Sequence, residues 1–128
     1  MRFTLGIEEK LKSKQLIKEL FEKGSRVKSF PFQLIYLRKE HSSEFPLKVG
    51  FTVPKRSIKL AVNRNRIKRM MREVYRKNKH GFAENIKEQY IFMFIYMAKE
   101  ELTYEELEKA IHKVCHKFST KITENEQS

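Results

Sequence analysis

The feature that most constrains the fold is a run of eight apolar and aromatic residues without a charge, Tyr90 to Met97. The run has the length of a β-strand, and polar and apolar residues do not alternate within it. This pattern is typical of a strand that is covered on both faces. We therefore expect residues 90–97 to form the central strand of a sheet.

The segments around this strand predict one domain over residues 1–119. Residues 13–24 have helical apolar spacing, with Ser13 as the N-cap and Gly24 as the C-terminal stop. Residues 30–37 and 47–53 are predicted strands joined as a hairpin by the polar residues 38–44, with a third, short strand near 26–28. From Ala61 the spacing becomes helical again, up to a predicted turn at His80-Gly81.

The last helix has the clearest start signal, because Thr103 and Glu106 form a capping box. Its apolar stripe runs to Phe118, and residues 120–128 are predicted to be a polar, disordered tail. The order is helix, two to three strands, basic helix, strand, helix. It predicts an α+β two-layer sandwich.

Positive charge is concentrated in one part of the chain. The net charge is +12, and residues 55–79 carry eleven basic side chains and one acid, Glu73. From Ala61 onward the apolar residues of this segment fall on one side of the predicted helix, and Asn65, Arg69, Arg72 and Arg76 fall on the other. Such a face suits a phosphate backbone, because guanidinium groups bind phosphate oxygens in pairs.

The alternative interpretation is an ordinary solvated charged face. It is less favoured here, because the acids that normally neutralise such a face at i to i+4 spacing are almost absent. We therefore predict an anionic partner, with nucleic acid as the main candidate.

The same segment resembles a known family. The basic pair Lys55-Arg56, followed by Ala61-Val62-Asn63-Arg64-Asn65-Arg66-Ile67-Lys68-Arg69, is similar to the RNR signature of the bacterial ribonuclease P protein component. The similarity extends to other segments, among them the end of the first helix at residues 21–24 and the start of the last helix at residues 102–107, and covers roughly residues 8–118. The resemblance implies a mixed sheet whose parallel strands are connected through the basic helix by an unusual left-handed crossover.

The resemblance also implies a set of RNA contacts. It assigns them to Arg64, Asn65, Arg66, Lys68 and Arg69, and helix geometry adds Arg72 and Arg76. The full predicted RNA-binding set, with the basic pair, is Lys55, Arg56, Arg64, Asn65, Arg66, Lys68, Arg69, Arg72 and Arg76.

A second site is implied by the resemblance alone. Family members hold the single-stranded 5′ leader of precursor tRNA in a cleft between the first helix and the sheet. Aromatic rings suit this task, because bases stack on them with little sequence preference. The corresponding residues here are Ile17, Phe21, Phe32, Ile35 and Tyr36. Filling the core is the competing interpretation for the strand aromatics.

The chain shows no set of residues suited to protein catalysis. Its carboxylates are scattered or lie in the last helix, His112 and His116 have no third ligand at matching spacing, and Cys115 falls on an apolar stripe. We predict no catalytic and no metal-binding residues in the protein.

These observations predict the RNA-binding subunit of ribonuclease P. By resemblance, its partners would be the catalytic ribonuclease P RNA and precursor tRNA, with Mg²⁺ held mainly by the RNA and cleavage carried out by the RNA. The alternative is a non-enzymatic RNA-binding module, such as a ribosomal protein or an RNA chaperone.

Location and other partners are predicted from what the sequence lacks. We expect a cytoplasmic protein without a membrane or protein partner, since the chain has no long uncharged apolar run and its first residues carry charges too early for a secretory signal.

Overall fold

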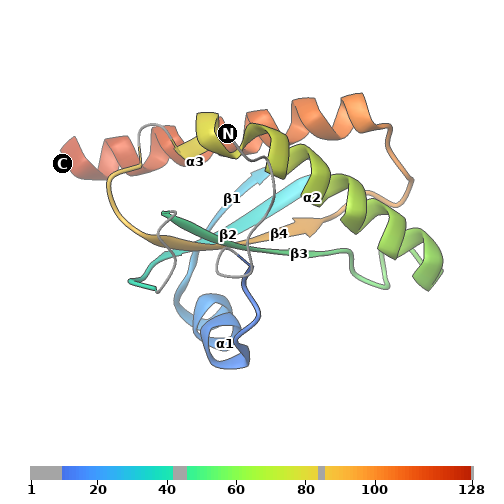
Figure 1. Ribbon diagram of the computed structural model, residues 1–128, viewed down its shortest axis with the longest axis horizontal. Helices are drawn as coiled ribbons and strands as arrows, with labels where there is room; N and C mark the ends of the chain where they lie inside the picture. The colour runs from blue at the N-terminus through green and yellow to red at the C-terminus, as the bar shows by residue number, and fades with distance from the viewer. Residues whose placement is uncertain (1–9, 42–45, 84–85, 128) are drawn as a thin grey trace.

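The computed structural model describes residues 10–41, 46–83 and 86–127, and these form three helices and four strands. Figure 1 labels each element. In chain order they are α1 (Lys14–Lys23), β1 (Ser25–Ser29), β2 (Phe32–Arg38), β3 (Leu47–Thr52), α2 (Ala61–Ala83), β4 (Tyr90–Tyr96) and α3 (Tyr104–Gln127).

The strands form one mixed sheet in the order β1-β2-β4-β3. β4 pairs antiparallel with β2 and parallel with β3, and every residue of β4 is buried. The prediction of a central strand covered on both faces is confirmed. The predicted hairpin between β2 and β3 is wrong, because β4 lies between these strands in the sheet.

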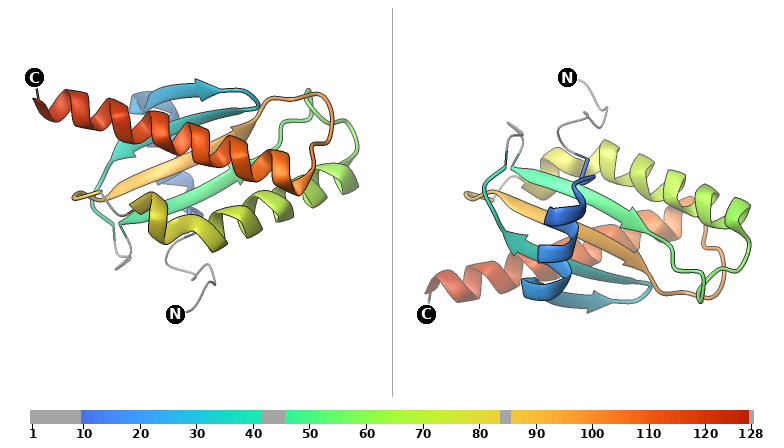
Figure 2. Two further views of the ribbon diagram at one scale, coloured as in Figure 1. Left: turned by 90° about the horizontal axis from the view of Figure 1, so that it is seen from above. Right: turned by 90° about the horizontal axis from the view of Figure 1, so that it is seen from below.

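The connection from β3 to β4 passes through α2. In the left view of Figure 2, α2 lies in front of the sheet. Rotating that view until β3 and β4 point upward places β4 to the left of β3. A right-handed crossover in front of the sheet would place β4 to the right, so this crossover is left-handed. The unusual hand implied by the family resemblance is therefore present.

Helices cover both faces of the sheet. α2 and α3 lie together on one face, and α1 lies on the other, against β2 and β4 (Figure 1). The larger core cluster fills the space under α2 and α3. A smaller cluster lies under α1 and is made of Leu11, Leu20, Ile35, Ile91, Met93 and Ile95. The predicted α+β class is confirmed, and α1 adds a partial third layer to the predicted two.

The predicted helix starts are formed by their capping residues. The Ser13 hydroxyl accepts a hydrogen bond from the Leu16 N–H at 3.3 Å. In α3 the Thr103 N–H donates to the Glu106 carboxylate at 3.1 Å, and the Glu106 N–H donates to the Thr103 hydroxyl at 3.2 Å. These reciprocal bonds satisfy backbone donors that the helix itself leaves unpaired.

Two helices extend beyond their predicted ends. α2 continues through the predicted turn at His80-Gly81 as far as Ala83. α3 continues to Gln127, so that residues 120–127, expected as a tail, are helical. Ile122 explains part of this extension, because it is buried against the larger core cluster.

Glycine often ends a helix by adopting a left-handed backbone conformation, but Gly24 does not end α1 in this way. Its backbone is extended, with φ −69° and ψ 152°, so no left-handed conformation is needed. A Cβ at this position would instead overlap the Leu20 carbonyl oxygen and lie 2.8 Å from Cγ2 of Ile35. Glycine is required here because the chain passes close to α1 and β2.

We therefore expect Gly24→Ala to lower the free energy of unfolding by about 1 to 3 kcal/mol, the usual cost of overpacking a core. Gly81→Ala is the matched control, because a Cβ there meets nothing within 4 Å and alanine favours the helix by about 0.5 to 1 kcal/mol. Chemical denaturation followed by circular dichroism measures both. A Gly24→Ala variant as stable as wild type would contradict the packing argument.

Candidate nucleic-acid interface

The basic helix α2 has one buried side and one exposed side. Ile67, Met71 and Val74 are fully buried against the sheet and α3. On the opposite side, Asn65 and Arg69 are exposed. The amphipathic helix predicted from the sequence is confirmed, and its buried side fixes the direction in which the charged side points.

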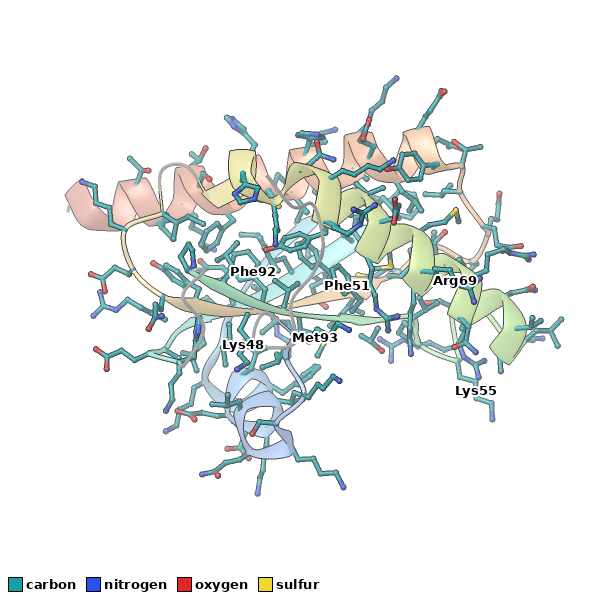
Figure 3. The ribbon with its side chains drawn as sticks, in the orientation of Figure 1. Lys48, Phe51, Lys55, Arg69, Phe92 and Met93 are labelled. Atoms are coloured by element: carbon teal, nitrogen blue, oxygen red, sulfur yellow. The ribbon has the colours of Figure 1, made fainter. Side chains whose placement is uncertain are left out.

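Three cations on α2 have no protein partner in the described part of the chain. Arg69 and Arg72 are exposed and Lys68 is half-buried, and none of them forms a hydrogen bond or ion pair with a described residue. Figure 3 shows Arg69 on the first half of α2. The concentrated positive charge of this half is therefore available to an external anion.

Arg64 has a structural task. Its guanidinium donates hydrogen bonds to the carbonyl oxygens of Ile58 at 3.0 Å and Lys59 at 2.6 Å. The Leu60 carbonyl in turn accepts the Arg64 N–H at 3.0 Å. Arg64 thus closes the segment before α2 onto the first turn of the helix. Its predicted RNA contact stays a prediction.

Arg66 is paired with a carboxylate from a distant loop. Its Nε and Nη2 donate to the two oxygens of Glu101 at 2.9 and 3.0 Å, and Nη2 also donates to Oδ1 of Asn63 at 2.7 Å. The side chains are 56% and 37% exposed. Exposed ion pairs of this kind contribute about 0 to 1 kcal/mol, so a phosphate can replace the carboxylate.

The second half of α2 contains an acid that pairs with two of its cations. Glu73 accepts hydrogen bonds from Arg76 and forms a second ion pair with Lys77 at 3.6 Å. The hydrogen bond from Arg76 lowers the pKa of the Glu73 carboxyl. The row of cations expected along the whole helix is therefore interrupted at Arg76.

The basic pair extends the charged surface beyond the helix. Lys55 and Arg56 are exposed in a turn that follows Pro54, where the Ser57 N–H donates to the Pro54 carbonyl at 3.0 Å. In Figure 3, Lys55 and Arg69 lie at the same end of the molecule, where α2 begins. The pair and the first half of α2 thus form one basic surface.

Two of the five predicted leader-binding residues lie on the wrong face of the sheet. Phe32 and Tyr36 point toward α2 and α3 and belong to the larger core cluster. The ring centroid of Tyr36 lies 4.8 Å from that of Phe118 on α3, in an edge-to-face arrangement. These two assignments are corrected: both aromatic rings fill the core.

The other three predicted leader-binding residues lie on the side of α1. Ile35 is on the α1 face of β2, but it is fully buried under the helix. Ile17 is half-buried against the same cluster, and Phe21 is 42% exposed. Of the residues assigned to the leader, Phe21 alone presents an exposed ring.

The described residues contain no cluster of three or more His, Cys, Asp or Glu side chains that could hold a metal ion. Cys115 is buried, and burial raises the pKa of its thiol. The His112 ring is engaged with the Asn78 side-chain oxygen, 3.2 Å away.

None of the described helices is long and apolar enough to cross a membrane.

Sequence reasoning missed the loop between β4 and α3. Lys99 and Glu101 lie in this loop, and both line a cavity together with Arg56 and Lys59. Only the folded arrangement places Lys99 on the same cavity as Arg56. No spacing along the chain signals this arrangement.

Comparisons with known proteins identify the family and the fold. The family model described as Ribonuclease P matches residues 5–119. The ribonuclease P protein component of Aliivibrio salmonicida is 31% identical over 122 residues, which cover 93% of this chain and 96% of that protein. The component of Porphyromonas gingivalis is 30% identical over 115 residues, which cover 87% and 83%.

Solved structures show the same fold. The RNase P protein of Thermotoga maritima aligns with a TM-score of 0.67 and 20% identity, over 84% of this chain and 94% of that one. The RNase P protein of Staphylococcus aureus gives a TM-score of 0.66 and 20% identity, over 83% and 91%. Family model, full-length relatives and fold thus point to one assignment: the chain belongs to the ribonuclease P protein family, whose members are RNA-binding components of a ribonucleoprotein that processes tRNA.

Proposed function

We propose that this chain binds the catalytic RNA of ribonuclease P through the first half of α2 and assists that RNA in removing the 5′ leader from precursor tRNA. The observation that carries the proposal is the set of three cations, Lys68, Arg69 and Arg72, that have no partner among the described residues and lie on a helix whose other side is buried. Because the buried side anchors the helix, binding RNA has to order the cationic side chains but not the backbone that carries them, which lowers the entropic cost of binding.

The proposed tasks of the protein are to neutralise phosphates and to hold the leader. Phe21 supports the second task, because its exposed ring on α1 can stack against a base. Mg²⁺ would be held mainly by the RNA. The described residues offer no carboxylate or histidine cluster for it, so we assign no step of the reaction to a protein-bound metal.

The basic surface predicts RNA binding that weakens steeply with salt, because each neutralised phosphate releases condensed counterions. Arg69→Ala is expected to make the slope of log K against log salt shallower by about 0.7 to 0.9. Arg38→Ala is the matched control, since Arg38 is exposed, lies at the end of β2 and pairs with Glu88. Equal slopes for the two variants in filter-binding titrations would contradict α2 as the docking surface.

Reconstitution tests the assignment to ribonuclease P. At low Mg²⁺, stoichiometric protein added to ribonuclease P RNA should restore cleavage of precursor tRNA, because the protein's cations replace part of the ionic screening. The measurement is release of the 5′ leader on a gel. Cleavage that is no faster with the protein than without it would favour a general RNA-binding module instead.

Arg64 and Arg69 should differ in what they affect. Arg64→Ala is expected to destabilise the fold by about 1 to 3 kcal/mol, because it removes a charged donor from two carbonyl groups. Arg69→Ala should weaken RNA binding with little change in stability. Thermal denaturation alongside the titrations separates these effects, and equal melting temperatures for Arg64→Ala and wild type would contradict the structural task of Arg64.

A further inference from the structure

A cavity of about 530 Å³ opens beside the first turn of α2, where two loops meet. One wall comes from the segment between β3 and α2 and contributes Arg56, Lys59 and Leu60. The other comes from the loop between β4 and α3 and contributes Lys99 and Glu101. The cavity therefore joins parts of the chain that are far apart in the sequence.

Most of the charged residues that line this cavity are cationic. Arg56, Lys59 and Lys99 supply three positive charges, and the one acid, Glu101, is already paired with Arg66. Three like charges around one space repel one another, and an anion entering that space relieves the repulsion. The cavity is thus suited to an anionic group.

The two loops are held in place before any ligand arrives. The Ser57 hydroxyl donates to the Tyr96 carbonyl at 3.2 Å, which ties the loop before α2 to the end of β4. The Tyr96 hydroxyl donates to the Glu100 carbonyl, and Ala98 is buried. A tyrosine hydroxyl is protonated at neutral pH, and burial raises the pKa of Tyr96 further, to about 12.

The rim of the cavity favours a nucleotide over a bare ion. Leu60 lines the cavity and is 62% exposed. A ribose or base placed beside the bound phosphate would cover this apolar side chain and remove it from water. A small inorganic anion would leave it exposed.

Glu101 occupies the position that a phosphate would take on Arg66. Its two oxygens accept hydrogen bonds from Nε and Nη2 of Arg66, the paired geometry with which arginine also binds phosphate. A phosphate entering the cavity would be repelled by this carboxylate and would compete with it for Arg66. The free protein thus carries an internal competitor at the edge of the cavity.

We propose that this cavity binds a backbone phosphate of the partner RNA through Lys99 and the cations of the β3–α2 segment, and that Glu101 competes with this RNA for Arg66. The inference rests on the proposed function and extends the RNA contact from α2 to the β4–α3 loop. It assigns Lys99 as an RNA-binding residue outside the basic segment.

The first test measures binding of ribonuclease P RNA by Lys99→Ala at several salt concentrations. We expect the salt slope to become shallower by about 0.7 to 0.9, the loss of one phosphate contact. Lys113→Ala, an exposed lysine on α3 outside the cavity, is the matched control and should keep the wild-type slope. Lys99→Arg should retain it as well. Circular dichroism confirms that each variant is folded.

The second test removes the competitor. Glu101→Gln should bind the RNA more tightly, by up to about fivefold, because a surface ion pair no longer has to be broken. Glu105→Gln is the control for net charge, since Glu105 is an exposed acid in the first turn of α3. The difference between these two variants isolates the role of Glu101 at Arg66.

The outcomes separate this inference from the proposed function. If Lys99→Ala matches Lys113→Ala while Arg69→Ala still weakens binding, the cavity is not an RNA site and the docking role of α2 stands. If Glu101→Gln binds no more tightly than Glu105→Gln, the competition is refuted. If Arg69→Ala and Lys99→Ala both match their controls, the proposed docking of the RNA on α2 fails together with the cavity site.

Discussion

The burial of one side of α2 is the interaction on which the rest of the molecule depends. Cations three and four residues apart on this helix repel one another, at a cost of a few tenths of a kcal/mol per pair. Ile67, Met71 and Val74 are fully buried beneath them, and burying such a side chain contributes about 1.5 to 3 kcal/mol. The stabilisation from burying these side chains therefore exceeds the repulsion between the cations. It keeps the helix folded, with Lys68, Arg69 and Arg72 on its first half having no carboxylate partner among the described residues.

The features that the sequence predicted correctly are those with a local or periodic signal. β4 was predictable because an uncharged apolar run of strand length is typical of a strand that is covered on both faces. The start of α3 was predictable because Thr103 and Glu106 bond to each other across a single turn. The two sides of α2 followed from helical spacing alone. In each case the residues that determine the structure are neighbours in the sequence.

The errors arose where pairing between distant segments decides the outcome. β2 is buried on both faces, so its residues do not alternate in polarity, and the sequence does not show which of them point toward α1. That choice is made by the register with β4, which places Phe32 opposite Tyr96 and Ile35 opposite Met93. The predicted hairpin failed for a related reason, since β4 enters the sheet between β2 and β3. The pairing of Arg66 with Glu101 and the position of Lys99 depend on the same folded arrangement.

The crossover from β3 to β4 has a consequence for how the molecule can vary. The helix that presents the cations is also the only covalent link between the two parallel strands, and one of these strands is the most deeply covered element of the sheet. The segment that carries α2 therefore cannot be deleted without disconnecting the sheet. Variation in the proposed RNA contact would be restricted to replacing side chains on a backbone that must remain intact.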